Sequence, residues 1–170
     1  MVVALSDTNV SLTVRSTMSE SLDLKTRQAA LAFSRSIAFD NGTGASQADK
    51  IWDDTRTITA SGTDDIDLAG VLVDAFGAVA TFVKVKGIFV AASALNTNNV
   101  VIGAAAATQF VGPFGAATHT VALTPGQFFA ITNSVSGWTV GAGASDLLRV
   151  TNSAGGTSVT YDIVILGTSA

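Results

Sequence analysis

The stretch AVATFVKVKGIFVAA, residues 78–92, decides the fold class of this chain. Its β-branched and aromatic residues would crowd a helix, whereas a pleated strand accepts them without strain. If the pleat runs unbroken, Val83, Val85 and Phe89 share one face, and we expect that face to be core. The pattern predicts a central strand of an antiparallel sandwich in which one side of the sheet is packed.

The opposite face of the same strand carries two charges. Lys84 and Lys86 are expected at a sheet surface that faces water or an acidic neighbour. Gly87 leaves an alternative open, because a glycine inside a strand often marks a bulge. A bulge there would move Ile88 and the residues after it to the opposite face.

The composition predicts one domain with a sparsely charged surface. The chain has 170 residues, of which 48% are hydrophobic and 13% charged, against about 25% charged in typical soluble domains. Its mean hydropathy is +0.46. Such a surface is suited to contact with other protein, so we expect function to come from assembly.

Charge and cysteine content argue against several other classes of protein. A net charge of −4 disfavours a nucleic-acid partner, which requires a basic patch. No cysteine is present, so neither disulfides nor thiolate metal sites are expected. No apolar run reaches the roughly 18 residues of a membrane span, and the first 15 residues do not have the pattern of a secretory signal.

The N-terminal part is expected to consist of strands. Val10–Val14 and Leu22–Leu24 alternate apolar and polar residues and could form a hairpin, with Ser16–Ser21 as its turn. Arg27–Phe39 fits both a strand face and a helix stripe, and we favour the strand.

A glycine-containing break at Asn41–Asp49 divides the chain. Residues 1–48 are too few for an independent core, so we interpret them as an N-terminal arm or extension. Such an arm would order by adding strands to a neighbouring subunit or to a larger shell. Residues 49–170 are expected to form a β-sandwich domain.

Short strands separated by turn residues follow one another through residues 49–170, which is typical of an all-β sandwich. Thr124–Gln127 (TPGQ) suits a type II turn, and we expect the strands flanking it to pair. The last strand, apolar on both faces near its end, should lie inside a sheet. The eight predicted strands are Arg56–Ala60, Asp65–Leu68, Thr81–Ala91, Asn99–Ile102, His119–Leu123, Gln127–Thr132, Leu147–Asn152 and Ser158–Leu166.

Carboxylates form the one cluster that suggests chemistry. A calcium site needs several oxygens converging on one loop, but TDDIDLAG lacks the EF-hand spacing, and alternation places Asp65 and Asp67 on one solvent face. We therefore expect a solvated or partner-facing strand and no metal. The cluster comprises Asp53, Asp54, Asp64, Asp65, Asp67 and Asp74.

The remaining candidate residues favour structural roles. His119 is the single histidine, and no Gly-x-Ser-x-Gly nucleophile motif is present, so no catalytic residue is predicted. His119 is expected near the mouth of the core with one nitrogen hydrogen-bonded. Trp52 and Trp138 could form sugar-stacking platforms, but we favour their packing as anchors of the sandwich. No nucleotide fingerprint or cofactor site is predicted.

Three segments together resemble small virion structural proteins of tailed bacteriophages. They are ADKIWDDTRTITASGTDDIDLAGVLVDAFG at 48–77, FVKVKGIFV at 82–90 and DLLRVTNSAGGTSVTYDIVILGTSA at 146–170. The resemblance covers residues 48–170 well and the first 47 residues weakly. It implies a β-sandwich, often jelly-roll-like, with about eight strands.

The resemblance also implies a non-enzymatic function in the virion, assembled in the host cytoplasm. The expected protein is a capsid decoration or cement protein whose partners are the major capsid protein and copies of itself, with a homotrimer favoured. The alternative is a minor tail or adsorption protein whose loops bind a host glycan. Neither function requires a cofactor, a small-molecule substrate, nucleic acid or a membrane.

Overall fold

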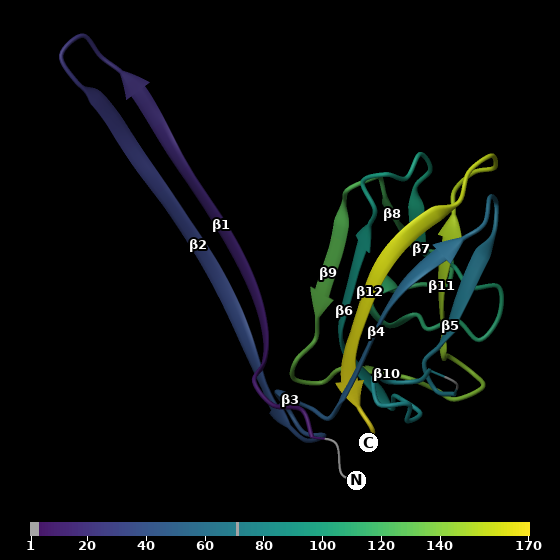
Figure 1. The fold of residues 1–170 in the computed structure, drawn as a ribbon. Helices are drawn as coiled ribbons and strands as arrows, with labels where there is room; N and C mark the ends of the chain where they lie inside the picture. Colours follow the sequence, from purple (N-terminus) through teal and green to yellow (C-terminus); the bar gives the residue numbers. More distant parts are fainter. Residues whose placement is uncertain (1–3, 71) are drawn as a thin grey trace.

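The computed structural model describes residues 4–70 and 72–170, and it shows an all-β chain in which a long hairpin projects from a sandwich body (Figure 1). Within the described residues, the helical structure is one 3₁₀ turn, η1 (Gly112–Phe114). The strands are β1 (Thr8–Ser21), β2 (Thr26–Asn41), β3 (Gln47–Ala48), β4 (Lys50–Ile58), β5 (Thr63–Asp67), β6 (Lys84–Ala92), β7 (Val100–Gly103), β8 (Thr120–Leu123), β9 (Phe128–Thr132), β10 (Trp138–Thr139), β11 (Leu147–Asn152) and β12 (Val159–Thr168).

The body consists of two antiparallel sheets. The large sheet has the order β10-β6-β12-β4, with β9 also pairing with β6, and the small sheet has the order β5-β11-β7-β8. Strands consecutive along the chain mostly alternate between the sheets, which is the arrangement of a jelly roll. The predicted antiparallel, jelly-roll-like sandwich is therefore confirmed, and each of its eight predicted strands has an observed counterpart.

The core lies between the two sheets because alternate residues of each strand point inward. Tyr161, Ile163 and Ile165 of β12 are fully or almost fully buried, and β12 lies between β6 and β4, as predicted for an interior strand. Val85, Ile88 and Val90 of β6 face them from the neighbouring strand. Ile66, Val100, Ile102, Leu148 and Val150 supply the opposing side from the small sheet.

The pleat of β6 is broken by a bulge, which corrects two predictions. The register with β12 shifts between Leu166 and Gly167, so that Lys86 is the extra residue. Lys86 is therefore buried and not at a solvent face. Val83 is also exposed and not core, for a separate reason: it lies in a bend before β6 begins at Lys84. Phe89 lies half-buried on the outer face, as the bulge alternative at Gly87 implied.

Two local predictions about pairing and turns were wrong. The TPGQ turn forms, with Gln127 N donating to Thr124 O at 3.0 Å and Gly126 at φ 80°, but its flanking strands do not pair. They belong to different sheets, because β8 pairs with β7 and β9 pairs with β6. In the N-terminal hairpin, Ser16–Ser21 is strand and residues 22–25 make the turn.

A polar network closes one open edge of the sandwich. Arg56 Nη2 of β4 donates to Asp64 Oδ1 of β5 at 2.8 Å, and Arg56 Nη1 donates to Asp54 Oδ2 at 3.0 Å. Tyr161 Oη donates to Asp64 Oδ2 at 2.7 Å, so Asp64 joins strands of both sheets. Burial raises the pKa of Asp64, but the hydrogen bonds from Arg56 and Tyr161 outweigh burial and leave that pKa below its usual value.

The lowered pKa of Asp64 predicts a loss of stability in acid. The ionised Asp64 carboxylate contributes its full stabilisation above the ordinary pKa of 3.8. This contribution is lost as the pH falls through the lower pKa that Asp64 has in the folded protein. Asp64→Asn should reduce the free energy of unfolding by about 1–3 kcal/mol at neutral pH, because Arg56 and Tyr161 lose a charged acceptor. Urea unfolding at pH 7 and at stepwise lower pH measures both effects.

The matched control is Asp53→Asn, which removes a carboxylate from an exposed position of β4. It should leave stability at pH 7 close to that of the wild type. Equal stability of Asp64→Asn and the wild type at pH 7, with parallel acid profiles, would contradict the role given to Asp64.

Candidate functional site: the arm and the outer face of the large sheet

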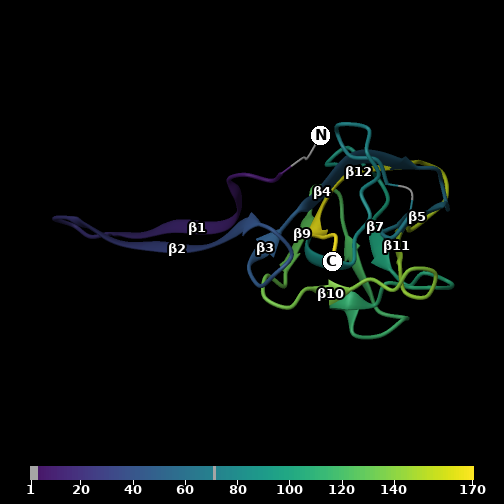
Figure 2. The same cartoon turned by 90° about the horizontal axis from the view of Figure 1, so that it is seen from below.

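The hairpin of β1 and β2, here called the arm (Thr8–Asn41), extends away from the body along almost its whole length (Figure 1). The view from below shows the same projection (Figure 2). Fourteen residue pairs follow one another from Thr8↔Phe39 to Ser21↔Thr26 without a register shift. At about 3.3 Å per residue, such a ribbon reaches roughly 45 Å.

Period-two alternation gives the arm two different faces. Val10 pairs with Ile37 and Val14 pairs with Phe33, so their side chains share one face. On the other face, Asn9 and Ser36 are hydrogen-bonded at 2.9 Å. The apolar arm face consists of Val10, Leu12, Val14, Met18, Ala29, Leu31, Phe33 and Ile37, and it also carries Ser16, Glu20, Arg27 and Arg35. The polar arm face consists mainly of serine, threonine and alanine with Asn9, Arg15 and Gln28.

The apolar arm face is largely uncovered in the single chain. The exposed fractions are 52% for Leu12, 47% for Val14, 76% for Met18 and 57% for Leu31. An isolated two-stranded ribbon is marginally stable at best in water, because one side of it has no packing partner. A contiguous exposed apolar face of this kind marks an interaction surface.

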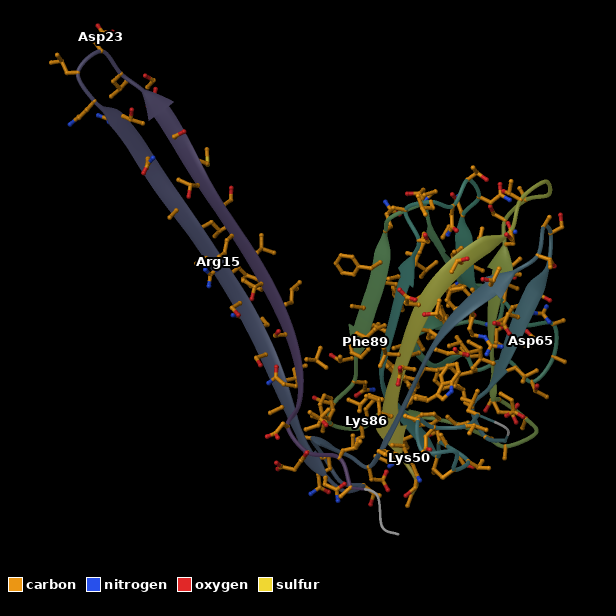
Figure 3. The ribbon with its side chains drawn as sticks, in the orientation of Figure 1. Arg15, Asp23, Lys50, Asp65, Lys86 and Phe89 are labelled. Atoms are coloured by element: carbon orange, nitrogen blue, oxygen red, sulfur yellow. The ribbon has the colours of Figure 1, made fainter. Side chains whose placement is uncertain are left out.

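A second uncovered apolar surface lies on the body. Outward-facing residues of the large sheet line up across β9, β6 and β12, with Ala130 opposite Phe89 and Phe89 opposite Val164. Phe128 is 69% exposed, and Phe89 lies on the side of the body that faces the arm (Figure 3). The outer sheet face consists of Ile51, Asp53, Phe89, Ala91, Phe128, Ala130, Asp162 and Val164.

The base of the arm meets the body at the edge of this outer sheet face. Phe39, Ala48 and Leu166 form a small buried cluster there, against which Val10 and Ile37 pack. A cleft of about 380 Å³ lies between residues 8–11 of the arm and the outer sheet face. The two apolar faces are therefore continuous at the arm base and diverge beyond it.

Lys86 holds the loop that joins the arm to the body. Its Nζ donates to the carbonyl oxygens of Gly44, Ser134 and Val135, each at 2.9 Å. Burial, together with the charge of Lys84, lowers the pKa of the Lys86 ammonium group. Ser46 N also donates to Ser134 O at 2.9 Å, so the arm root is tied to the β9–β10 loop.

The predicted carboxylate cluster is dispersed in the structure. Asp64 belongs to the network with Arg56, Asp65 accepts two hydrogen bonds from Arg149 at 2.6 Å, and Asp67 and Asp74 accept backbone hydrogen bonds. Within residues 4–70 and 72–170, no group of three or more histidine, cysteine or acidic side chains is placed to hold a metal ion. In the same residues, no helix is long and apolar enough to cross a membrane.

The histidine and the tryptophans have structural surroundings. His119 Nδ1 lies 2.7 Å from Phe114 O, which matches the predicted hydrogen bond, although the side chain is exposed. Trp52 is 4% exposed within the core, and half-buried Trp138 packs against the core from β10. Their predicted roles as anchors of the sandwich are confirmed.

Comparison with known proteins adds no family assignment. No protein-family model matches the chain, and a search of curated proteins returned no match.

The role of Lys86 in fixing the arm predicts a local effect of its removal. Lys86→Met should loosen the arm root, because the carbonyl groups of Gly44, Ser134 and Val135 lose their donor at a cost of about 1–3 kcal/mol. Amide hydrogen exchange at Ser46 should accelerate by about tenfold or more, since each 1.4 kcal/mol of opening free energy is a factor of ten.

Lys84→Met is the control, since Lys84 lies in the same strand and its Nζ makes no hydrogen bond within the described residues. It should leave exchange at Ser46 unchanged. If Lys86→Met and the wild type exchange at the same rate at Ser46, Lys86 does not hold the arm root.

Proposed function

We propose that this chain is a structural protein of a tailed-bacteriophage virion, a decoration or cement protein that binds the major capsid protein and copies of itself. The trimer is the oligomer we favour, and the proposed location is the virion, assembled in the host cytoplasm. The protein stabilises the shell through protein–protein contacts and carries out no reaction.

The observation that carries this proposal is the uncovered apolar arm face. Burying a Val, Leu or Met side chain contributes about 1.5–3 kcal/mol, so Leu12, Val14, Met18 and Leu31 together offer a large driving force for association. None of these four side chains belongs to the core of the body, which closes between the two sheets. An extended apolar ribbon on a stable body is therefore suited to linking one subunit to another protein surface.

The jelly-roll body and the sparse surface charge also support an assembly role. Charged residues make up 13% of the chain, and the outer sheet face presents apolar side chains beside Asp53 and Asp162. Interfaces in stable assemblies are depleted of charge at their centre and polar at their rim.

The alternative, a tail or adsorption protein that binds a glycan, receives less support. It predicts exposed aromatic residues near the loops at 96–99, 112–115 and 141–145. Phe114 is buried, and Trp138 is half-buried against the core. Saccharide binding by the purified chain would favour this alternative.

The proposed function predicts that particle binding depends on the apolar arm face. Val14→Glu combined with Leu31→Glu should reduce binding to particles that lack the chain by about a hundredfold or more, because two apolar contacts are replaced by buried charges. Co-sedimentation with such particles measures the binding, and the thermal stability of the particle measures the cementing effect.

Thr13→Glu combined with Ala30→Glu is the matched control. It introduces the same charge one position away, on the polar arm face. The control should bind as the wild type does. The proposal fails if wild-type chain is absent from purified particles, or if both double variants bind as well as the wild type.

A further inference from the structure

We propose that copies of this chain exchange arms, with the apolar arm face of one copy packed on the outer sheet face of another copy. This inference deepens the proposed function and rests on it for its setting, since it names the self-contact through which the subunits are joined. Both halves of the contact are present on the same chain, as an uncovered ribbon face and an uncovered sheet face.

The arm is not built to fold back onto its own body. The β1–β2 register is regular over all fourteen pairs, so no bulge along the ribbon provides a hinge. The root is fixed by Lys86 and by the parallel pairing of Asp40 and Asn41 with β3. Beyond its root the arm diverges from its own body (Figure 3), and most of its apolar face is therefore left exposed to contact another molecule.

The dimensions favour an assembly in which every copy both gives an arm to a neighbour and receives one. A two-stranded ribbon roughly 45 Å long and about 10 Å wide has one face of roughly 450 Å². A stable interface buries about 800 Å² on each partner. One arm alone falls short of that area, whereas a copy that both gives and receives an arm reaches it.

The charges of the two surfaces are complementary. The arm has four cations and three anions, giving a net charge of +1, whereas residues 42–170 have five cations and nine anions, giving −4. On the apolar arm face, Arg35 lies over the Phe33 ring at 4.7 Å. On the outer sheet face, Asp53 and Asp162 form no ion pair within the part of the chain that the structure describes.

A second copy fits these observations better than an unrelated protein does. The receiving surface has an apolar middle formed by Phe89, Ala130 and Val164, with Asp53 and Asp162 toward β4. The arm matches this pattern, with apolar residues along its length and Arg35 on the same face; Arg27 also lies there, opposite Glu20. A capsid protein as the occupant of the arm face is the competing outcome of the experiment.

Mixed cysteine cross-linking tests the exchange directly, because the chain has no cysteine of its own. One tagged chain carries Met18→Cys and a second, differently tagged chain carries Ala130→Cys. The two are unfolded together, refolded as a mixture and oxidised. We expect a disulfide-linked pair containing one chain of each kind, because the arm of one copy reaches the sheet of the other.

One control accompanies this experiment. Thr17→Cys, on the polar arm face, replaces Met18→Cys and should give at least a tenfold lower yield of the mixed product.

A second experiment tests the receiving surface. Phe128→Glu should reduce the oligomer to smaller species in sedimentation equilibrium. Its control is Leu95→Glu, at a 94% exposed loop position, which should leave the oligomer unchanged.

The exchange is refuted by any of three results. In the first, the wild type is monomeric at all concentrations at which the chain binds particles. In the second, Met18→Cys and Thr17→Cys give equal cross-linking yields. In the third, cross-links form only when both cysteines are on one chain.

The failures of this inference and of the proposed function can be told apart. A chain that exchanges arms but is absent from particles keeps the inference and overturns the proposed function. A chain that binds particles through the apolar arm face while remaining monomeric in solution supports the proposed function and overturns the arm exchange. In that case the shell covers the apolar arm face.

Discussion

The buried ammonium group of Lys86 is the interaction on which the placement of the arm depends. It lies at the bulge of β6 and donates to three carbonyl oxygens from two different loops. Burial of an unpaired ammonium group costs several kcal/mol, and three charge-assisted hydrogen bonds of about 1.5–3 kcal/mol each offset that cost. Because one acceptor is Gly44, the same bonds that satisfy the charge also fix where the arm leaves the body.

The two uncovered apolar faces arise from the same period-two alternation that builds the core. In the body, alternation places one side of each strand between two sheets, where Tyr161 and Ile163 are buried. In the arm and on the outer sheet face, the same pattern produces apolar surfaces with no second layer. The molecule thus has a closed core and two apolar surfaces that remain exposed in the single chain.

Much of the body could be predicted from sequence, because its strands are short and separated by glycine, proline and asparagine. The position of β12 inside a sheet followed from its apolar residues on both faces. Pairing across the TPGQ turn could not be predicted, since local turn chemistry does not determine whether a chain returns to the same sheet or crosses to the other.

The burial of Lys86 and the length of the arm were harder to predict. Lysine is almost never fully buried unless its donors are satisfied, and the three acceptors of Lys86 lie more than 40 residues away in sequence. Only Gly87 signalled that the pleat could break. Ser16–Ser21 has Met18 as its one apolar residue, so the sequence pattern indicated a turn where the structure has an exposed strand.

In the assembled state, we expect protein to cover the apolar arm face. Met18 reports on this directly, since the residue is 76% exposed in the single chain and its thioether is oxidised by peroxide at a rate that depends on access. The rate of sulfoxide formation at Met18, followed by mass spectrometry from dilute to concentrated protein, is the measurement. We expect the rate to fall by about tenfold or more as copies associate, and an unchanged rate in fully associated protein would show that the apolar arm face stays uncovered.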